Sequence, residues 1–133
     1  MICRLCPREC GAQRTEQGGG GFCGMPAGIR VARAALHRWE EPIISGERGS
    51  GTVFFCGCNL NCIFCQNYKI NHSVMGIEAD EETLCRIMLD LQHQGAHNIN
   101  LVTPAPHVPL IARTLPLARQ AGLTICLLYT SDA

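Results

Sequence analysis

Residues 52–65 read TVFFCGCNLNCIFC. The first part, Thr52 to Cys56, is a β-branched and aromatic run flanked by glycines, which predicts a buried strand. The second part carries Cys58, Cys62 and Cys65, with three and then two residues between successive cysteines. The stretch therefore predicts a strand that ends in a loop bearing three thiols. Because functional loops of α/β folds gather at the carboxyl ends of strands, this loop is the first candidate for a functional site.

Three thiolates on one short loop can hold three irons of a 4Fe-4S cluster and leave the fourth iron open. An electron carrier closes its cluster with four thiolates, whereas an open iron can bind a small chelating ligand. Asn59 and Asn61 favour the sharp turn that such a loop needs, since Asn tolerates left-handed backbone conformations. The alternatives are a structural zinc or a closed cluster that uses Cys56 as a fourth thiolate. Cys56 and Cys58 point to the same side of an extended strand, so geometry leaves this alternative open.

The cysteine loop, with Thr52–Cys58 before it and Gln66-Asn67-Tyr68 after it, resembles the radical S-adenosylmethionine (SAM) superfamily. The longer run is similar to uncharacterised iron-sulfur proteins related to pyruvate formate-lyase activating enzyme. The resemblance implies an enzyme in which Cys58, Cys62 and Cys65 ligate a 4Fe-4S cluster whose open iron binds SAM. An electron from a donor such as flavodoxin or ferredoxin then cleaves SAM to methionine and a 5′-deoxyadenosyl radical, which abstracts hydrogen from a substrate. If the comparison extends to the substrate, the target is a glycine of a partner enzyme.

The resemblance also implies two cofactor contacts. Phe64 would lie beside the cluster and the adenine of SAM and limit the access of water. Activating enzymes usually carry a Gly-Gly-Glu type segment after the second strand, and this chain has Thr103-Pro104-Ala105-Pro106-His107 there instead. Thr103 is therefore a candidate SAM contact, with a plain turn residue as the alternative. Catalytic side chains stay unassigned, and the competing class is a non-catalytic iron-sulfur or zinc protein for electron transfer or structure.

Residues 1–28 form a head that is rich in cysteine and glycine and has little apolar material of its own. We expect its order to come from a bound metal or from docking on the rest of the chain. Four thiols can close a zinc site or a second iron-sulfur cluster, and their spacing does not choose between the two. Reduced cysteines that simply pack are the alternative. The four cysteines of this possible second metal site are Cys3, Cys6, Cys10 and Cys23.

The remaining sequence predicts alternating strands and helices. Residues 29–51 are a strand-rich lead-in, with one or two strands before a turn at Glu41–Pro42. Asp80 can cap an amphipathic helix that Gly95 ends. The further predicted elements are a strand at Asn98–Val102, a helix from Pro109 to Ala121 and a strand at Leu123–Leu128.

This alternation predicts an α/β fold with a parallel sheet. The resemblance makes residues 52–133 the first units of a partial (β/α)6 TIM-like barrel, preceded by the metal-binding head. At roughly thirty residues per βαβ unit, we expect the barrel to be truncated. Residues 126–133 look like a translated sequencing-adapter tail, and we expect them to be non-native.

The overall composition limits the classes of partner. The charges of eleven basic and eleven acidic side chains cancel, so the composition shows no excess of positive charge that would attract nucleic acid or an anionic membrane. The amino terminus has no apolar stretch of signal-peptide length, so a cytoplasmic protein is expected. In a reducing compartment, ten cysteines favour metal ligation over disulfides. His37, Trp39, Glu40 and Glu41 are close in sequence and could bind a metal or act as acid and base, but a strand with a charged, solvated edge explains them more simply.

Overall fold

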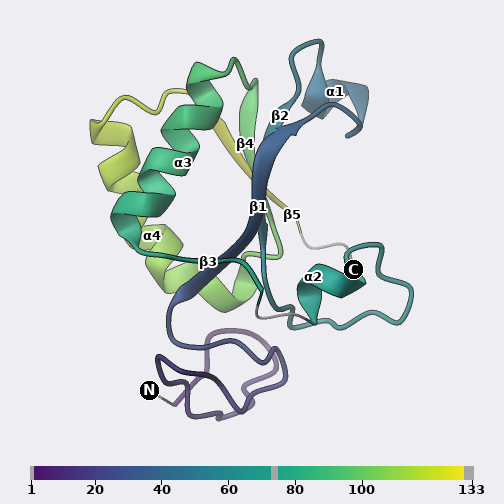
Figure 1. The fold of residues 1–133 in the computed structure, drawn as a ribbon, viewed down its shortest axis with the longest axis vertical. Coiled ribbons are helices and arrows are strands. Elements are labelled where there is room, and N and C mark those ends of the chain that lie inside the picture. The colour runs from purple at the N-terminus through teal and green to yellow at the C-terminus, as the bar shows by residue number, and fades with distance from the viewer. Residues whose placement is uncertain (1, 73–74, 131–133) are drawn as a thin grey trace.

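The computed structural model describes residues 2–72 and 75–130, and its centre is a five-stranded sheet in the order β3-β1-β2-β4-β5 (Figure 1). The two long helices, α3 and α4, stand together on one side of this sheet (Figure 1). The short helices α1 and α2 lie at its other side. The elements in chain order are β1 (Ile29–His37), α1 (Pro42–Ser45), β2 (Ser50–Phe55), α2 (Tyr68–Asn71), β3 (Ile77–Ala79), α3 (Glu81–His93), β4 (Asn98–Val102), the 3-10 turn η1 (Ala105–His107), α4 (Val108–Gln120) and β5 (Cys126–Thr130).

The sheet is mixed, which corrects the expectation of a parallel sheet in part. Strands β2, β4 and β5 are parallel, as predicted, and are joined through α3 and α4. Strands β1 and β3 run antiparallel to their neighbours. Parallel neighbours need a long crossover, usually a helix. The segment between β1 and β2 contains only the four-residue α1, so the chain doubles back beside β1.

Several predicted elements are confirmed with nearly the predicted bounds. The carboxylate of Asp80 accepts a hydrogen bond from the backbone N–H of Thr83 at 2.8 Å and caps α3. This bond lowers the pKa of Asp80 below its usual value. Gly95 follows α3 with φ of 93°, a left-handed conformation that glycine adopts without strain. Strand β4 has the predicted bounds, and α4 begins one residue before Pro109.

Two predictions of local structure need refinement. The turn expected at Glu41–Pro42 is the first turn of α1, where the Ile44 N–H donates to the Glu41 carbonyl at 2.8 Å and Pro42 takes a position that suits its fixed φ. The last strand begins at Cys126 rather than at Leu123. The side chain of Gln92 accepts from the backbone N–H groups of Thr124 and Ile125, which holds these residues in a loop against α3. Residues 131–133 of the suspected tail lie outside the described residues.

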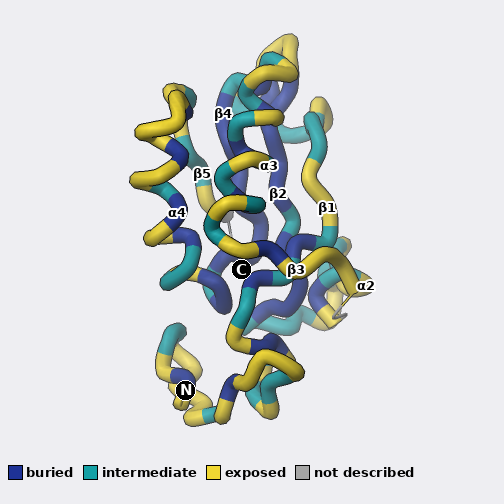
Figure 2. The backbone as a smooth tube through the Cα atoms, turned by 60° about the vertical axis from the view of Figure 1, so that its left-hand side comes forward, coloured by how far each residue is buried: buried dark blue, intermediate teal, exposed yellow. Residues whose placement is uncertain are grey.

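Strand β4 is buried along its whole length, on both faces (Figure 2). On one of these faces, the side chain of Asn98 is hydrogen-bonded to neighbouring segments. The amide oxygen of Asn98 accepts from the Ser50 hydroxyl at 2.6 Å, and its amide nitrogen donates to the Ile44 carbonyl at 2.8 Å. Helix α1 therefore covers the polar face of the sheet near the amino ends of the parallel strands.

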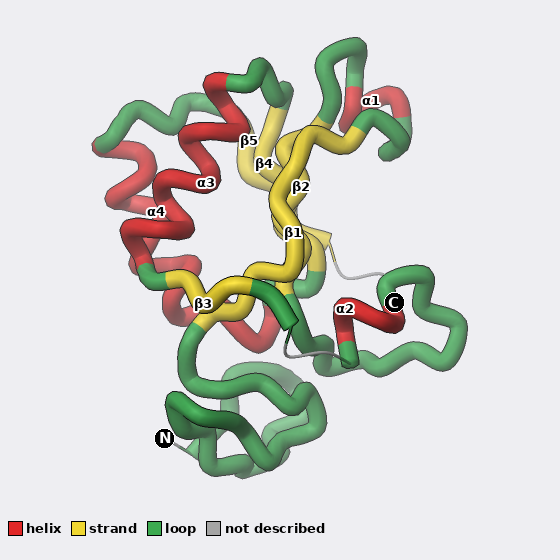
Figure 3. Tube along the Cα trace, viewed as in Figure 1, coloured by secondary structure: helices red, strands yellow, loops and turns green. Residues whose placement is uncertain are grey.

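The head consists of loops (Figure 3), and its described part contains isolated β-bridges but no strand or helix. It lies at the end of the molecule to which the carboxyl ends of β2 and β4 point (Figure 1). The lead-in strand β1, by contrast, is part of the same sheet as β2.

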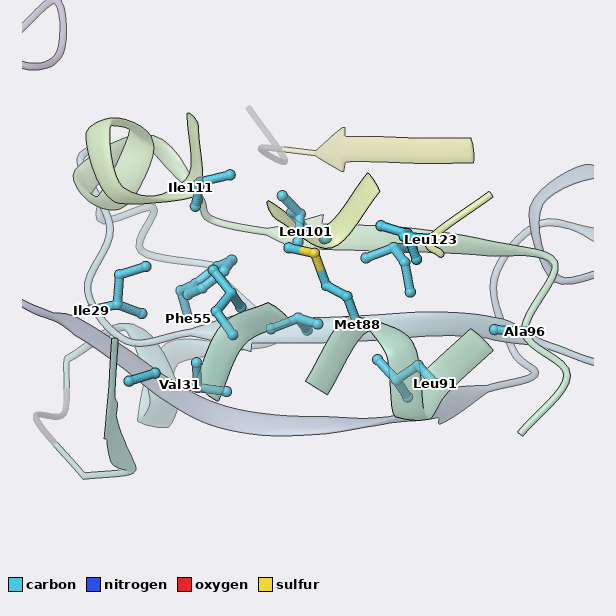
Figure 4. Close-up of a cluster of buried hydrophobic side chains, with 14 residues drawn as sticks. Ile29, Val31, Phe55, Met88, Leu91, Ala96, Leu101, Ile111 and Leu123 are labelled. Carbon is cyan, nitrogen blue, oxygen red and sulfur yellow. The ribbon is translucent and has the colours of Figure 1, made fainter. Parts of the chain in front are cut away.

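The apolar core lies between the sheet and the pair α3 and α4 (Figure 4). Met88 of α3 is completely buried and points toward Leu101 of β4. This packing fixes the strands whose ends carry the cysteine loop. The other core residues are Ile29, Val31, Val53, Phe55, Ala79, Leu84, Leu91, Ala96, Ile99, Ile111, Ala118 and Leu123. In the described part of the chain, none of the helices combines the length and the apolar character that a membrane span requires.

Candidate metal centre

The cysteine loop begins where β2 ends, as the sequence predicts. Gly57 has φ of 74°, and a Cβ there would lie 2.2 Å from the Met25 side chain, so the head leaves no room for a larger residue. Asn61 takes the predicted left-handed conformation, with φ of 51°. The loop then closes with a hydrogen bond from the Cys65 N–H to the Cys62 carbonyl at 3.2 Å. The backbone is thus tightly turned between its three thiols.

Hydrogen-bond donors already face two of the three sulfur atoms. The N–H of Leu60 points to the Cys58 sulfur at 3.4 Å, and the side-chain amide of Asn71 points to the Cys65 sulfur at 3.1 Å. Metal binds the thiolate form of cysteine, and an N–H group can donate a hydrogen bond to a metal-bound thiolate. Cys58 is buried, and Cys62 and Cys65 are partly exposed. The donor chemistry therefore fits a thiolate-ligated cluster.

The three thiols are distributed along one turned loop. In residues 2–72 and 75–130, no three Cys, His, Asp or Glu side chains lie close enough together to hold one ion. A four-iron cube is larger than a single ion, and each of its irons can take a separate thiolate.

Cys56 is bonded away from this loop. Its side chain is buried and donates to the carbonyl of Met75. Burial raises the pKa of the Cys56 thiol above its usual value. A thiol that is buried, protonated and already hydrogen-bonded is a poor fourth ligand, which argues against the closed cluster considered from the sequence.

The two candidate cofactor contacts lie in different surroundings. Phe64 is 83% exposed at the surface of the loop. Thr103 is buried directly after β4, and its hydroxyl oxygen lies 3.1 Å from the Phe55 carbonyl and 2.8 Å from the Val102 carbonyl, which share its one proton. Its φ of 57° is unusual for a β-branched residue. Thr103 therefore ties the end of β4 to the end of β2, next to the cysteine loop.

His107 holds the start of the same loop. Its ring is buried against Phe55, and its Nε2 lies 3.0 Å from the Cys56 carbonyl, to which it donates. Its Nδ1 is buried without a partner among the described residues. Burial lowers the pKa of His107 to about 4, with a smaller contribution from the nearby Arg14. His107 is thus a neutral structural group at pH 7, and this long-range contact had no signal in the sequence.

The head contacts the cysteine loop through Arg8. Its guanidinium lies 3.6 Å from the centre of the Phe22 ring and donates to the carbonyls of Asn59 and Leu60. From the other side, the Asn61 amide donates to the Phe22 carbonyl at 3.2 Å. Sequence reasoning missed Arg8, whose only signal was its position among the head cysteines.

Arg14 fastens the head to the sheet. Its side chain is 4% exposed and donates to the Pro26 carbonyl within the head and to the Pro106 carbonyl of η1 at 2.7 Å. It also lies 4.0 Å from the sulfur of Cys3. A buried guanidinium that bonds carbonyls from both parts favours one fixed arrangement of the head.

Of the four head cysteines, the structure brings Cys3 and Cys10 together. Backbone N–H groups of Ala12 and Phe22 point to the Cys10 sulfur, as does the Cys3 side chain, and these bonds lower the pKa of Cys10. Cys6 and Cys23 are partly exposed. The described residues thus contain two of the four predicted ligands as neighbours, but not a complete site.

A hollow of about 540 Å³ opens on the polar face of the sheet beside the cysteine loop. The imidazole of His37 lies 3.9 Å from the carboxylate of Glu40 in it. The structure thus places the charged sequence cluster next to Gln66 and Asn67, which follow the last cysteine. The residues that line the hollow are His37, Trp39, Glu40, Glu41, Ile44, Phe54, Gln66, Asn67 and Val102.

Comparison with known proteins identifies one family. A family described as "4Fe-4S single cluster domain" matches residues 44–122, which is more than half of the chain. The chain is also similar to a protein of Methanocaldococcus jannaschii that is named only as uncharacterised, with 31% identity over 123 residues. The match covers 85% of this chain and 34% of the relative, so the chain spans about a third of that protein's length. No solved structure matches.

The buried His107 predicts a pH-dependent stability. Its pKa is about 4 in the folded chain and near 6.5 when unfolded, so the unfolded chain binds the proton first as the pH falls. The free energy of unfolding should therefore decrease between pH 6.5 and pH 4, by about 3 kcal/mol from this residue alone. Urea unfolding at several pH values measures this decrease, which the His107→Gln variant should lack.

The matched control is His93→Gln, because His93 is exposed at the end of α3. It should keep the pH dependence of the unmodified chain. If the slopes of His107→Gln and His93→Gln are the same, His107 is not buried in its neutral form and the account of the loop's anchoring is wrong.

Proposed function

The chain belongs to the 4Fe-4S single cluster domain family, and on that premise we propose that it is a radical SAM enzyme. The observation that carries the proposal is the loop of Cys58, Cys62 and Cys65, in which two sulfurs accept N–H bonds. The neighbouring Cys56 thiol is buried and bonded elsewhere. Three thiolates without a fourth leave one iron of the cluster free for a chelating cosubstrate.

In this proposal, the protein's work is to bind, orient and exclude water. The three thiolates hold the cluster, and Phe64, exposed on the same loop, covers the adenine of SAM. When bound, the cluster supplies the electron that cleaves SAM into methionine and a 5′-deoxyadenosyl radical. Arg8, His107 and Thr103 fix the backbone at the start of the loop, so that the cosubstrate meets a partly pre-formed site.

In this proposal, Thr103 contributes to the binding of SAM through its backbone. Its hydroxyl is engaged with two carbonyls, while its left-handed conformation turns the chain sharply at the end of β4. Strained backbone of this kind is concentrated at functional sites. We therefore assign the peptide groups around Thr103, and not its hydroxyl, as the candidate contact for the amino group of SAM.

The substrate would bind in the hollow beside Gln66 and Asn67, within reach of a radical formed at the loop. Its volume and polar lining suit a flexible segment, such as the glycine loop of a partner enzyme. An electron donor of the flavodoxin or ferredoxin class would dock at the exposed loop. The ten free cysteines suit a reducing compartment such as the cytoplasm.

We also infer that β2, β4 and β5 are consecutive strands of a partial (β/α)6 barrel. Three parallel strands with α3 and α4 on one side support this inference. The cysteine loop lies at the carboxyl end of the first of them, where barrel enzymes carry their sites.

A second metal site in the head is a separate proposal, with Cys3, Cys6, Cys10 and Cys23 as ligands. Its support is the environment of Cys10, whose sulfur accepts backbone N–H bonds next to Cys3. In the described part of the head, isolated bridges are the only regular structure, so a metal would add stability that its small apolar content lacks. Either zinc or an iron-sulfur cluster is compatible with four thiolates.

The enzyme proposal predicts a response to SAM. The electron paramagnetic resonance spectrum of anaerobically reconstituted, reduced protein should contain a cluster signal that shifts when SAM is added. Cys62→Ala should lose that signal, and Cys85→Ser, in α3, should keep it. A signal that is indifferent to SAM would contradict the enzyme proposal and favour electron transfer, and zinc without iron would favour a structural site.

The head site predicts a change in metal content. Replacement Cys10→Ser should remove the metal of the head from the purified protein, while the signal of the cysteine loop persists. Elemental analysis measures iron and zinc per chain, with Cys85→Ser as the matched control. Equal metal content in both variants would refute a metal site at Cys10.

A further inference from the structure

Asn71 lies against the sulfur of Cys65. It is the last residue of α2 and is 5% exposed, and its side-chain nitrogen is 3.1 Å from the sulfur. The loop residues around Cys65 are exposed, so this amide is the buried polar group on that side of the sulfur. The following inference rests on the proposed cluster and adds a residue that tunes it.

The chemistry fixes the direction of this hydrogen bond. A thiolate can only accept, so the amide N–H of Asn71 donates to it. The opposite orientation would place the amide oxygen against the lone pairs of the sulfur. In the observed orientation, that oxygen is buried and has no partner among the described residues.

The backbone holds the amide in place. The Tyr68 N–H donates to the Cys65 carbonyl at 3.1 Å, so the first residue of α2 is hydrogen-bonded to the last cysteine of the loop. One turn later, the Asn71 N–H bonds to the Asn67 carbonyl at 2.9 Å, and the amide returns to the Cys65 side chain. The rings of Tyr68 and His72 stack, with 4.2 Å between their centres, which further fixes this short helix.

Packing alone does not explain an asparagine here. A leucine has a similar size and would fill the same buried space without a buried amide oxygen that lacks a partner among the described residues, which is costly. The contact that an asparagine gains is the one to Cys65. The hydrogen bond to the Cys65 sulfur thus explains why residue 71 is an asparagine.

We propose that Asn71 is a positioning residue that donates a hydrogen bond to the Cys65 thiolate and raises the reduction potential of the cluster. Reduction adds negative charge, part of which resides on the sulfur atoms. An N–H donor stabilises that charge, and hydrogen bonds to sulfur are a recognised determinant of cluster potential. Asn71 would thereby make the cluster easier to reduce by its electron donor.

A redox titration followed by electron paramagnetic resonance tests the proposal. Asn71→Leu removes the donor at nearly constant size and should give a more negative midpoint potential. Asn71→Asp replaces the donor with a carboxylate and should lower the potential further. The matched control is Gln94→Leu, which removes an exposed side-chain amide at the end of α3, outside the cysteine loop and the hollow. Its potential should equal that of the unmodified protein.

A second measurement needs no variant and applies even if Asn71→Leu fails to retain a cluster. Protein labelled with ¹⁵N only in asparagine side-chain amides should give an electron–nuclear coupling between one amide nitrogen and the reduced cluster. Absence of that coupling, or equal potentials for Asn71→Leu and Gln94→Leu, would overturn the role of Asn71.

The outcomes separate the two claims. A cluster that responds to SAM but has the same potential with and without the Asn71 amide would overturn this inference alone. A cluster that ignores SAM but shifts in potential in Asn71→Leu would overturn the enzyme proposal alone.

Discussion

The close approach of the head to Gly57 is the constraint on which the site depends. A Cβ at position 57 would meet the Met25 side chain at 2.2 Å and the Cys23 carbonyl at 2.9 Å. The backbone between β2 and Cys58 must therefore pass directly against the head. Because of this contact, the loop takes its shape from two parts of the chain at once, one supplied by the sheet and one by a segment without regular structure.

The start of the loop is then held from two sides. On the sheet side, the buried His107 and Thr103 donate to the carbonyls of Cys56 and Phe55. On the head side, Arg8 donates to the carbonyls of Asn59 and Leu60. These contacts flank Cys58, the first thiol of the loop, and none of them comes from a proposed metal ligand. Such surroundings commonly tune the properties of a metal centre.

The sequence predicted what local signals encode. Asp80 and Gly95 mark the ends of α3. The cysteine spacing indicated a turned loop and an iron-sulfur cluster, and the family match is to a 4Fe-4S domain. The short α2 was missed, because four residues give no periodicity. The contacts of Arg8 and His107 were also missed, because they join residues about fifty positions apart through backbone carbonyls, which every residue carries. The antiparallel course of β1 was missed for the same reason, since pairing is decided between distant segments.

The central claim is that the loop holds a cluster with one iron left open by the protein. The most direct test is the Mössbauer spectrum of protein reconstituted with ⁵⁷Fe, recorded with and without SAM. The account predicts that SAM changes the isomer shift of one iron of the cluster and leaves the other irons unaffected, since thiolates hold them. A spectrum in which all irons are equivalent and insensitive to SAM would contradict it.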